Sequence, residues 1–482
     1  MKKIITLAIG SVFFAQSINS IAQQNINKYI KVYFSQPVDN TYSTTGVNAT
    51  YLNNTIFDTL AAYISRAKYT VDITQYEYET WGGDPIANAV NAAYSRGVKV
   101  RYIQDGSYAS KNTGVKLLNA SIPVIASPTT SSYGIMHNKF VIVDEYASDS
   151  TQSYVLTGSA DWDATMSSHD YNNMIVFQSK VLARAYTHEF NIMWGDTTHG
   201  GASIVSATKF GPYKPNSGTH VFHIGGSLVE LYFSPSDSTN NHILKTIKSA
   251  KAELYCGMNA FSDTTDAWNI VYRKGASVYA NAILDQYSSG TYVTYTSILP
   301  KGLGSNFVGY VNANYLYHNK YLVTDPASPC YDPKVLTGSH NWTFSADTKN
   351  DENTVIVHND TIANLYLQAF ASDFKNIGGT ALTKQKPCPA GINNINGTES
   401  QIDVFPNPFS GSTTIKYTLA TDESVTIAVY NIMGQKVSTL ADGRMLDAGT
   451  HSFTFNNNVA GVYILQIQEG AHMYAKKLVA VN

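Results

Sequence analysis

An internal duplication constrains the fold of this 482-residue chain more than any other feature. Residues 137–144 read HNKFVIVD, and residues 318–325 repeat the pattern as HNKYLVTD. Each copy is followed by Gly-Ser, one further residue, Asp or Asn, and Trp, at residues 158–162 and 338–342. A repeat of this kind indicates two similar structural units, each large enough to build a core, in one chain.

The residues before each copy predict an alternation of helices and strands. Amphipathic helical patterns at residues 55–68 and 241–251 run directly into strand patterns at residues 69–73 and 252–255. A second helix and strand follow in both places. This alternation predicts two α/β units with mostly parallel sheets, packed together as one bilobal unit. We place the two halves at residues 27–200 and 226–380, with a Gly-, Ser-, Thr- and Pro-rich linker at about residues 198–226.

The first 22 residues have the pattern of an export signal. Lys2 and Lys3 give a positive start, residues 4–15 are apolar, and Ser20-Ile21-Ala22 forms a small-x-small cleavage site. The apolar stretch is shorter than the ~20 residues that span a bilayer, so we expect cleavage after Ala22 instead of a membrane anchor. No later apolar run is long enough for a transmembrane segment in the mature form. Three cysteines are too few for a disulfide scaffold, although export would permit a bridge between Cys330 and Cys388.

The C-terminal part of the chain differs from the two halves in composition and in its predicted secondary structure. Residues 384–401 are rich in Pro, Asn, Gly, Ser and Thr, as expected of a solvated linker. From residue 402 to residue 482, short alternating strand patterns are separated by turn residues. These predicted strands lie at residues 413–417, 425–430, 451–455, 462–467 and 476–481. We therefore expect a small C-terminal β-sandwich that carries no part of the catalytic machinery.

The repeated motif carries the chemistry. Residues two apart in an extended strand project to the same face, so His137 and Lys139 project together, as do His318 and Lys320. Two copies related by a pseudo-two-fold axis would present two imidazoles to each other with two ammonium groups beside them. One histidine could then attack a phosphodiester and form a covalent intermediate, while the other protonates the leaving oxygen. The lysines would stabilise the charge on the phosphoryl oxygens, so we expect no metal ion and no cofactor, and a bell-shaped pH profile.

The duplicated H-x-K-x4-D pattern, with Gly-Ser-x-Asn downstream, resembles the phospholipase D superfamily from about Tyr29 to Lys375. This resemblance implies a bilobal α/β fold with one active site between the halves and a phosphohistidine mechanism. By position, His137 and His318 match the catalytic histidines, with His137 as the nucleophile and His318 as the acid. The other residues that match the family's site are Lys139 and Lys320 as phosphate-binding lysines, Asn341 as the phosphate-contacting asparagine, and Glu352 as the residue that orients a histidine.

Further motif residues complete the candidate site. Asp144 and Asp325 belong to the catalytic motif, but they lie on the opposite strand face from the histidines, which favours a structural role. Ser159 and Ser339 are candidate hydrogen-bond donors to the phosphate, after Gly158 and Gly338 in predicted tight turns. The first copy departs from the pattern because it has Asp161 in place of Asn. An ionised Asp161 would repel a phosphate, so it must be protonated, paired with a lysine, or turned away.

The tail resembles a second family. Residues 404–409, VFPNPF, residues 429–437, VYNIMGQKV, residues 460–465, AGVYIL, and the terminal residues 476–478, KKL, resemble the C-terminal sorting domain of type IX secretion. This resemblance implies passage across the outer membrane to the exterior or the cell surface, through the type IX machinery. The alternative for the tail is a carbohydrate-binding β-module, which usually shows a cluster of exposed aromatic residues that this segment lacks.

The sequence favours a secreted monomeric phosphodiesterase that cleaves phospholipid headgroups. The alternative substrate is nucleic acid, because DNA presents the same phosphodiester. The formal net charge of −2, with 35 acidic and 33 basic residues, gives no global basic field and disfavours this secreted nuclease. Low charge and 34 tyrosines favour a lipid interface. An inactive surface binding protein is the third possibility, because of Asp161.

Overall fold

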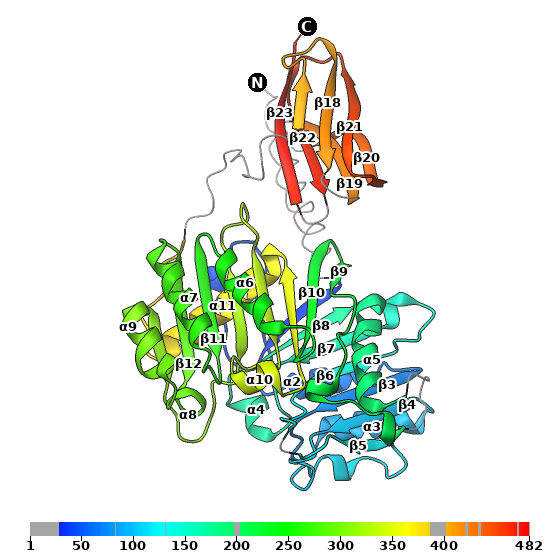
Figure 1. Cartoon of the computed structure of the whole chain (residues 1–482), viewed down its shortest axis with the longest axis vertical. Helices are drawn as coiled ribbons and strands as arrows, with labels where there is room; N and C mark the ends of the chain where they lie inside the picture. The colour runs from blue at the N-terminus through cyan, green and yellow to red at the C-terminus, as the bar shows by residue number, and fades with distance from the viewer. Residues whose placement is uncertain are drawn as a thin grey trace, which may run out of the picture. The chain divides into compact units, whose positions relative to one another are not determined.

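The structure is a computed structural model that describes residues 28–81, 83–130, 132–196, 203–385, 402–419, 423–431, 435–469 and 472–481. The chain divides between residues 388 and 389 into two compact units. The larger unit contains both copies of the repeated motif, and each of its halves contributes one eight-stranded sheet (Figure 1). The fold is therefore the expected α/β arrangement of two tandem halves, followed by a small β unit.

Some of the sequence predictions concern residues that lie outside the described ranges. The expected signal peptide, residues 1–22, and most of the expected linker, residues 384–401, lie outside the described residues. Cys256 is a buried free thiol and Cys330 is disulfide-bonded, whereas the expected partner Cys388 also lies outside the described residues. Within the described ranges, no helix is both long enough and apolar enough to cross a membrane.

The first half forms a sheet with the strand order β2-β1-β8-β7-β6-β3-β4-β5. Its strands are β1 (Ile30–Phe34), β2 (Thr50–Tyr51), β3 (Thr70–Gln75), β4 (Lys99–Gln104), β5 (Val124–Ala126), β6 (Phe140–Val143), β7 (Tyr154–Gly158) and β8 (Asn173–Gln178). Its helices are α2 (Ile56–Ile64), α3 (Pro85–Ser95), α4 (Ala164–Ser168) and α5 (Lys180–Trp194).

The second half repeats this plan, with the strand order β13-β12-β11-β14-β15-β16-β10-β9. Its strands are β9 (Val221–Ile224), β10 (Ser227–Ser234), β11 (Glu253–Met258), β12 (Tyr279–Asp285), β13 (Phe307–Tyr310), β14 (Lys320–Thr324), β15 (Lys334–Gly338) and β16 (Glu352–His358). Its helices are α6 (Thr239–Ser249), α7 (Thr264–Gly275), α8 (Gln286–Ser289), α9 (Leu299–Leu303), α10 (Phe344–Thr348) and α11 (Asp360–Asn376).

The expectation of mostly parallel sheets is wrong. Strands β3, β4 and β5 are parallel, and so are β11, β12 and β13. The strands that follow, β6 to β8 and β14 to β16, pair antiparallel with their neighbours. Antiparallel neighbours need only a short connection, whereas a parallel pair needs a crossover. The helix-containing crossovers α3 and α7 occur early in each half, and the motif strands come after them.

Several helices begin at a residue whose side chain caps the first turn, among them α3 and α5. The Asp84 side chain accepts hydrogen bonds from the N–H groups of Ile86 and Ala87, and Pro85 takes the first position of α3, where a missing N–H costs nothing. Ser179 caps α5, which ends at Gly195 in the left-handed conformation with φ 78°. These caps fix the ends of helices that pack on the sheets.

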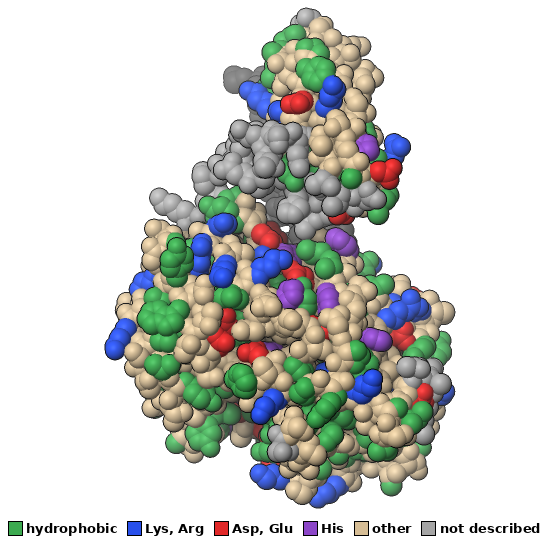
Figure 2. All heavy atoms as spheres, viewed as in Figure 1, with side chains coloured by type: hydrophobic (Ala, Val, Ile, Leu, Met, Phe, Trp, Pro, Cys, Tyr) green, Lys and Arg blue, Asp and Glu red, His purple; other side chains and the backbone are tan. Residues whose placement is uncertain are grey.

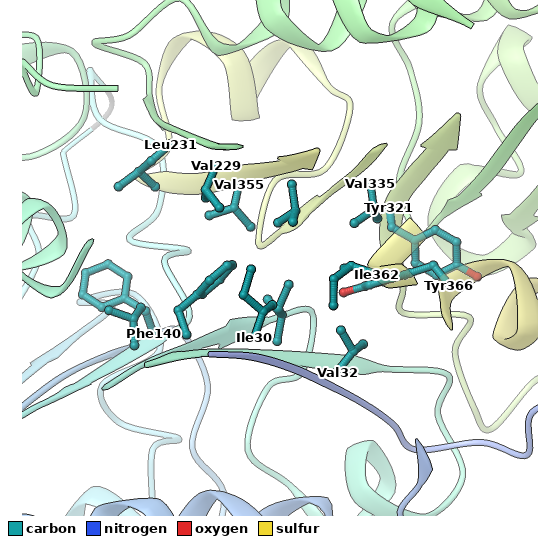
Figure 3. Packing of buried hydrophobic residues seen from close by; sticks show 14 of the residues in the cluster. Ile30, Val32, Phe140, Val229, Leu231, Tyr321, Val335, Val355, Ile362 and Tyr366 are labelled. Atoms are coloured by element: carbon teal, nitrogen blue, oxygen red, sulfur yellow. The ribbon is translucent and has the colours of Figure 1, made fainter. Parts of the chain in front are cut away.

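Three apolar clusters hold the larger unit together. Helices α2 and α3 cover one face of the first sheet, and α6, α7 and α9 cover one face of the second. The inner faces of both sheets, together with α5 and α11, share a third cluster that joins the halves. Figure 3 shows Ile30 and Val32 of the first half facing Val229, Leu231 and Val355 of the second. Burial of this shared apolar surface stabilises the packing of the two halves against each other.

The segment expected to be a linker is partly built into this unit. Residues 205–207 and 211–213 form short helical turns, and β9 forms a hairpin with β10. The Lys214 ammonium is fully buried and forms ion pairs with Glu189 and Asp351, the latter at 2.7 Å. The Gly-, Ser-, Thr- and Pro-rich composition suggested a linker, but its described residues are anchored to the larger unit by polar contacts.

The smaller unit is a β-sandwich of antiparallel strands. Ile415, Val425, Ile427 and Leu465 are among the residues of its buried core. Its two sheets have the orders β17-β18-β21 and β20-β19-β22-β23. The strands are β17 (Ile402–Phe405), β18 (Gly411–Leu419), β19 (Glu423–Asn431), β20 (Lys436–Leu446), β21 (Gly449–Asn457), β22 (Gly461–Glu469) and β23 (His472–Ala480).

Candidate active site

The two histidines of the motif lie immediately before central strands of the two sheets. His137 precedes β6 and His318 precedes β14, and both side chains are at least nine-tenths buried. Asp105, after β4, accepts a hydrogen bond from the N–H of Met136 at 2.8 Å. Asp285, the last residue of β12, accepts one from the N–H of Tyr317 at 2.9 Å. Matching aspartates therefore fix the backbone directly before each histidine.

Each histidine receives its hydrogen-bond partner from the other half. The His137 Nδ1 atom lies 2.8 Å from Glu352 Oε2, and the His318 Nδ1 atom lies 3.2 Å from Asn172 Oδ1. Both partner oxygens can only accept, so Nδ1 is the protonated nitrogen in each ring. This leaves Nε2 of each neutral imidazole as the atom that can accept a proton or attack an electrophile.

The two serines support these partners. Ser159 Oγ donates to Asn172 Oδ1 at 2.8 Å, and Ser339 Oγ donates to Glu352 Oε2 at 2.7 Å. Both serines are fully buried. A hydroxyl has one proton, and here it is committed to the histidine-orienting residue. The expected role of Ser159 and Ser339 as donors to a phosphate is therefore corrected to support of Asn172 and Glu352.

The glycines before these serines permit a close approach of strands. A Cβ atom on Gly158 would meet the carbonyl oxygen of Asn173 at 2.1 Å, and one on Gly338 would meet that of Asn353 at 2.1 Å. Gly338 also has φ 149°. The glycines thus allow β7 and β15 to lie against β8 and β16, so the expected tight turn is not their main function.

Asp161 forms an ion pair with a motif lysine. Its Oδ1 lies 2.8 Å from Lys139 Nζ and accepts a hydrogen bond from Gln75 Nε2 at 3.3 Å. Its Oδ2 lies 3.8 Å from His318 Nε2. Asp161 thereby connects a lysine of the first half with a histidine of the second. Of the three states considered for this carboxyl, pairing with a lysine is the one observed.

The second lysine lies in an unfavourable environment for its charge. Lys320 Nζ donates to the carbonyl oxygen of His318 at 2.8 Å. Burial and the nearby Lys139 ammonium lower the pKa of Lys320 to about 7. Burial, followed by Lys320, Lys139 and His137, also lowers the pKa of His318 well below its usual value. A bound anion would favour the charged forms of Lys320 and His318 and would therefore raise both pKa values.

Asn341 is placed differently from Asp161. Its Oδ1 accepts a hydrogen bond from the N–H of Ala260 at 3.2 Å, and the side chain is only partly buried. Its Nδ2 donates to none of the residues that the structure describes, which leaves a donor for a substrate oxygen. The phosphate-binding role of Asn341 stays a prediction.

Asp144 and Asp325 do not join this group. Each has a positive φ, 52° and 54°, at the far end of its motif strand. Asp144 accepts hydrogen bonds from the N–H groups of residues 68–70, and Asp325 from those of residues 251–253. Their inclusion among the catalytic residues is corrected, because their carboxylates tie a helix end to a strand.

Aromatic and acidic side chains line one side of the site. The Tyr76 ring lies 5.0 Å from the His137 ring and 4.8 Å from the Tyr108 ring, and Lys139 Nζ lies 5.1 Å from its centroid. Burial, followed by Asp161, Asp163 and Glu79, raises the pKa of Glu77 to about 8. This side of the site is therefore acidic.

The sequence interpretation missed Asn172 as the partner of His318. The signal was available, because alignment of the two copies places Asn172-Asn173 opposite Glu352-Asn353. Asp105 and Asp285 were visible as matching residues at strand ends, but nothing in the sequence connected them with the histidines.

Two family models match the chain. Residues 60–194 and 243–374, together more than half of the chain, match the family described as cardiolipin synthase, PLD-like domain. Residues 403–482 match the secretion system C-terminal sorting domain.

Similar proteins of known name include a mitochondrial cardiolipin hydrolase of Xenopus tropicalis, 29% identical over 139 residues, which are 29% of this chain and 60% of that protein. A phospholipase D of Rickettsia bellii is 24% identical over 174 residues, covering 36% of this chain and 83% of that protein. The chain thus spans about 60% of the length of the Xenopus relative and 55% of a Drosophila melanogaster relative with the same name.

The fold is also found in a solved structure. The phosphatidylserine synthase of Haemophilus influenzae superposes with a TM-score of 0.51 at 14% identity, over 76% of this chain and 92% of that one. This similarity concerns the bilobal fold.

Proposed function

The chain belongs to the family of phospholipase D-like domains and ends in a type IX sorting domain, and on this premise we propose that it is a secreted phosphodiesterase that hydrolyses phospholipid headgroups. One observation carries the proposal. Two histidines and two lysines from matching positions of the repeat converge, and each histidine is oriented by an acceptor from the opposite half.

His137 is the nucleophile in this proposal. Its Nε2 attacks phosphorus, and a bond from Nε2 to phosphorus forms as the bond to the leaving alcohol breaks. The ring, still protonated at Nδ1, then carries a positive charge. The buried Glu352 carboxylate, 2.8 Å from Nδ1, stabilises that charge, and the amide of Asn172 cannot do the same for His318.

His318 is the acid and then the base. Its protonated Nε2 gives a proton to the leaving oxygen, and later removes a proton from the water that breaks the bond between nitrogen and phosphorus. Burial and the neighbouring lysines lower the pKa of His318. An anionic phosphodiester beside the ring would favour its charged form, so substrate binding prepares the acid.

Lys139, Lys320 and Asn341 serve the phosphoryl oxygens. Fixed positive charges and an amide donor stabilise the negative charge that these oxygens carry in the transition state. Because the two lysines are buried and held in place, they need little reorganisation when charge develops.

The surroundings of the site favour a lipid headgroup over nucleic acid. The carboxylates of Glu79 and Asp163 would repel the neighbouring phosphates of a polynucleotide, whereas Tyr76 and Tyr108 can contact a neutral or cationic headgroup. On the face shown in Figure 2, Lys and Arg side chains are spread singly or in small groups without a continuous basic stripe. The products would be phosphatidate and a free alcohol.

A trapping experiment tests the chemistry. The full chain with His318→Ala is mixed with a p-nitrophenyl phosphodiester, whose leaving group needs no proton. We expect a burst of nitrophenol and a phosphoryl adduct on His137, detected by peptide mass analysis at alkaline pH. His137→Ala should give neither. An adduct on another residue, or turnover by His137→Ala at the wild-type rate, would contradict the assignment.

A substrate comparison tests the specificity. Wild-type protein is incubated with phosphatidylcholine vesicles and, separately, with plasmid DNA. Choline release without DNA nicking is expected, whereas nicking without choline release would make the protein a nuclease. Activity on neither, together with no adduct on His137, would favour a binding protein.

A further inference from the structure

We propose that Asp161 competes with the substrate phosphate for Lys139 and His318. When the phosphate binds, it takes the place of the Asp161 carboxylate between these two residues. Substrate binding is thereby coupled to the uptake of a proton by the protein. The inference rests on the proposed phosphodiester site but not on the identity of the alcohol. In this proposal, Asp161 controls the affinity for the phosphodiester and the pH range over which the protein binds it.

The contacts of Asp161 are those that a phosphodiester needs. One carboxylate oxygen lies 2.8 Å from Lys139 Nζ, and the other lies 3.8 Å from His318 Nε2. The two unesterified oxygens of a phosphodiester have the same negative charge and the same need for a lysine. Asp161 is 3% exposed, so its charge has little access to water as an alternative partner.

The second half shows what the site is like without this carboxylate. Asn341 stands at the matching position, accepts from a backbone N–H, and does not bind Lys320. Lys320 donates instead to the carbonyl oxygen of His318. The second lysine is therefore available to an anion, whereas the first is occupied by Asp161.

The charges around Asp161 make two anions costly at this place. Lys139 and Lys320 are the cations near Asp161, and Asp163 lies on the acidic side of the site. Burial and the two lysines lower the pKa of His318, and burial and the neighbouring carboxylates raise the pKa of Glu77. If a phosphodiester enters, its oxygens and the carboxylate share the same cations. Binding of one proton by Asp161 removes the conflict, because a protonated carboxyl donates a hydrogen bond to the phosphate, as the amide of an asparagine would.

The test uses a ligand that neither reacts nor titrates. Dimethylphosphinate has two anionic oxygens but no ester bond to cleave, and it keeps a single negative charge across the pH range, so its affinity reports the protein groups alone. Binding to the full chain is measured by calorimetry at pH 4.5, 6 and 8 for wild type and Asp161→Asn. We expect Asp161→Asn to bind at least tenfold more tightly than wild type at pH 8, and the difference to shrink to about twofold at pH 4.5.

Asp163→Asn is the matched control. It removes a carboxylate from the same loop, but Asp163 caps α4 through the N–H groups of Thr165 and Met166, which asparagine also does. We expect its affinity at pH 8 to stay within threefold of wild type. Asp161→Ser serves as a second variant if Asp161→Asn fails to fold, and it should also bind more tightly.

Three results would overturn the proposal. Equal or weaker binding by both Asp161 variants at pH 8 would make Asp161 a positioning residue for Lys139. Equal tightening by Asp163→Asn would show a general effect of charge. A difference that does not depend on pH would exclude proton uptake. None of these results bears on the trapping of His137, so failure here is distinguishable from failure of the proposed function.

Discussion

Glu352, on β16 of the second half, accepts a hydrogen bond at 2.8 Å from Nδ1 of His137, which precedes β6 of the first half. Both side chains are buried, and burial alone would raise the pKa of the Glu352 carboxyl. The adjacent His137 nevertheless lowers it below its usual value. A charge is thus kept in the core at a point where the halves meet, so neither half contains a complete site.

Glu352→Gln should reduce kcat by about 100-fold or more with little change in KM. The neutral amide can still occupy the space and accept from Nδ1, but it does not stabilise the positive charge of phosphorylated His137. Steady-state kinetics, with thermal unfolding to confirm the fold, checks this expectation. A loss confined to KM would show that Glu352 acts on substrate binding instead.

The expected pH dependence of kcat/KM follows from the pKa of Lys320. Its pKa of about 7 means that the ammonium is charged below pH 7 and neutral above it. Since the charged form binds phosphate, we expect kcat/KM to fall as pH rises through about 7. The lowered pKa of His318 acts in the same direction, because the acid form is lost as pH rises. A kcat/KM that rises between pH 6 and 8 would contradict both. In Asp161→Asn this decline should persist.

The repeat allowed the sequence to predict much of this site. Two copies of H-x-K bring His137, Lys139, His318 and Lys320 to equivalent places, and the strand periodicity separated Asp144 and Asp325 from them. The sequence could not show that Ser159 and Ser339 donate to Asn172 and Glu352, because those bonds depend on the pairing of β7 with β8 and of β15 with β16. Strand direction was also misjudged, since periodicity does not distinguish parallel from antiparallel neighbours.

The tail shows another limit of the sequence pattern. Strand β20, residues 436–446, was missed because only Ala441 and Leu446 of its side chains are buried. Register irregularities between β19 and β20 break the alternation further. Strands β18 and β22, whose inward residues alternate regularly, were recognised from residues 413–417 and 462–467.

Asp325→Ala should destabilise the larger unit by about 3–5 kcal/mol. Three N–H groups, of residues 251–253, lose a charged acceptor, and alanine tolerates the left-handed conformation at φ 54° less well than aspartate does. Asp144→Ala should have the same effect in the first half. Urea unfolding measures the loss, and kcat for the folded fraction should be unchanged. A large fall in the kcat of the folded protein would show that Asp144 and Asp325 contribute to catalysis.

Lys214→Met should be among the most damaging single changes, although Lys214 lies in the segment that looked like a linker. Its ammonium is fully buried between the carboxylates of Glu189 and Asp351, and Asp351 also accepts from the Gly211 N–H and the Tyr133 hydroxyl. Removal of the cation leaves two uncompensated buried charges, which typically costs about 3–5 kcal/mol. Urea unfolding at pH 7 measures this loss.

Lys214→Met should also disturb the active site, and the loss of stability that it causes should depend on pH. The Asp351 carbonyl oxygen accepts from the N–H of His137 at 2.9 Å, and Glu352 is the next residue, so a displaced Asp351 moves both members of the catalytic pair.

Burial already raises the pKa of Glu189 to about 7 even with Lys214 present, and loss of the lysine raises it further. A raised folded-state pKa means that the variant gains stability as pH falls and protons neutralise the carboxyls. The variant should therefore be less impaired at pH 5 than at pH 8, and Glu189→Gln in the same chain should recover part of the loss. Equal destabilisation at both pH values, without recovery in the double variant, would show that Lys214 acts through its packing and not through its charge.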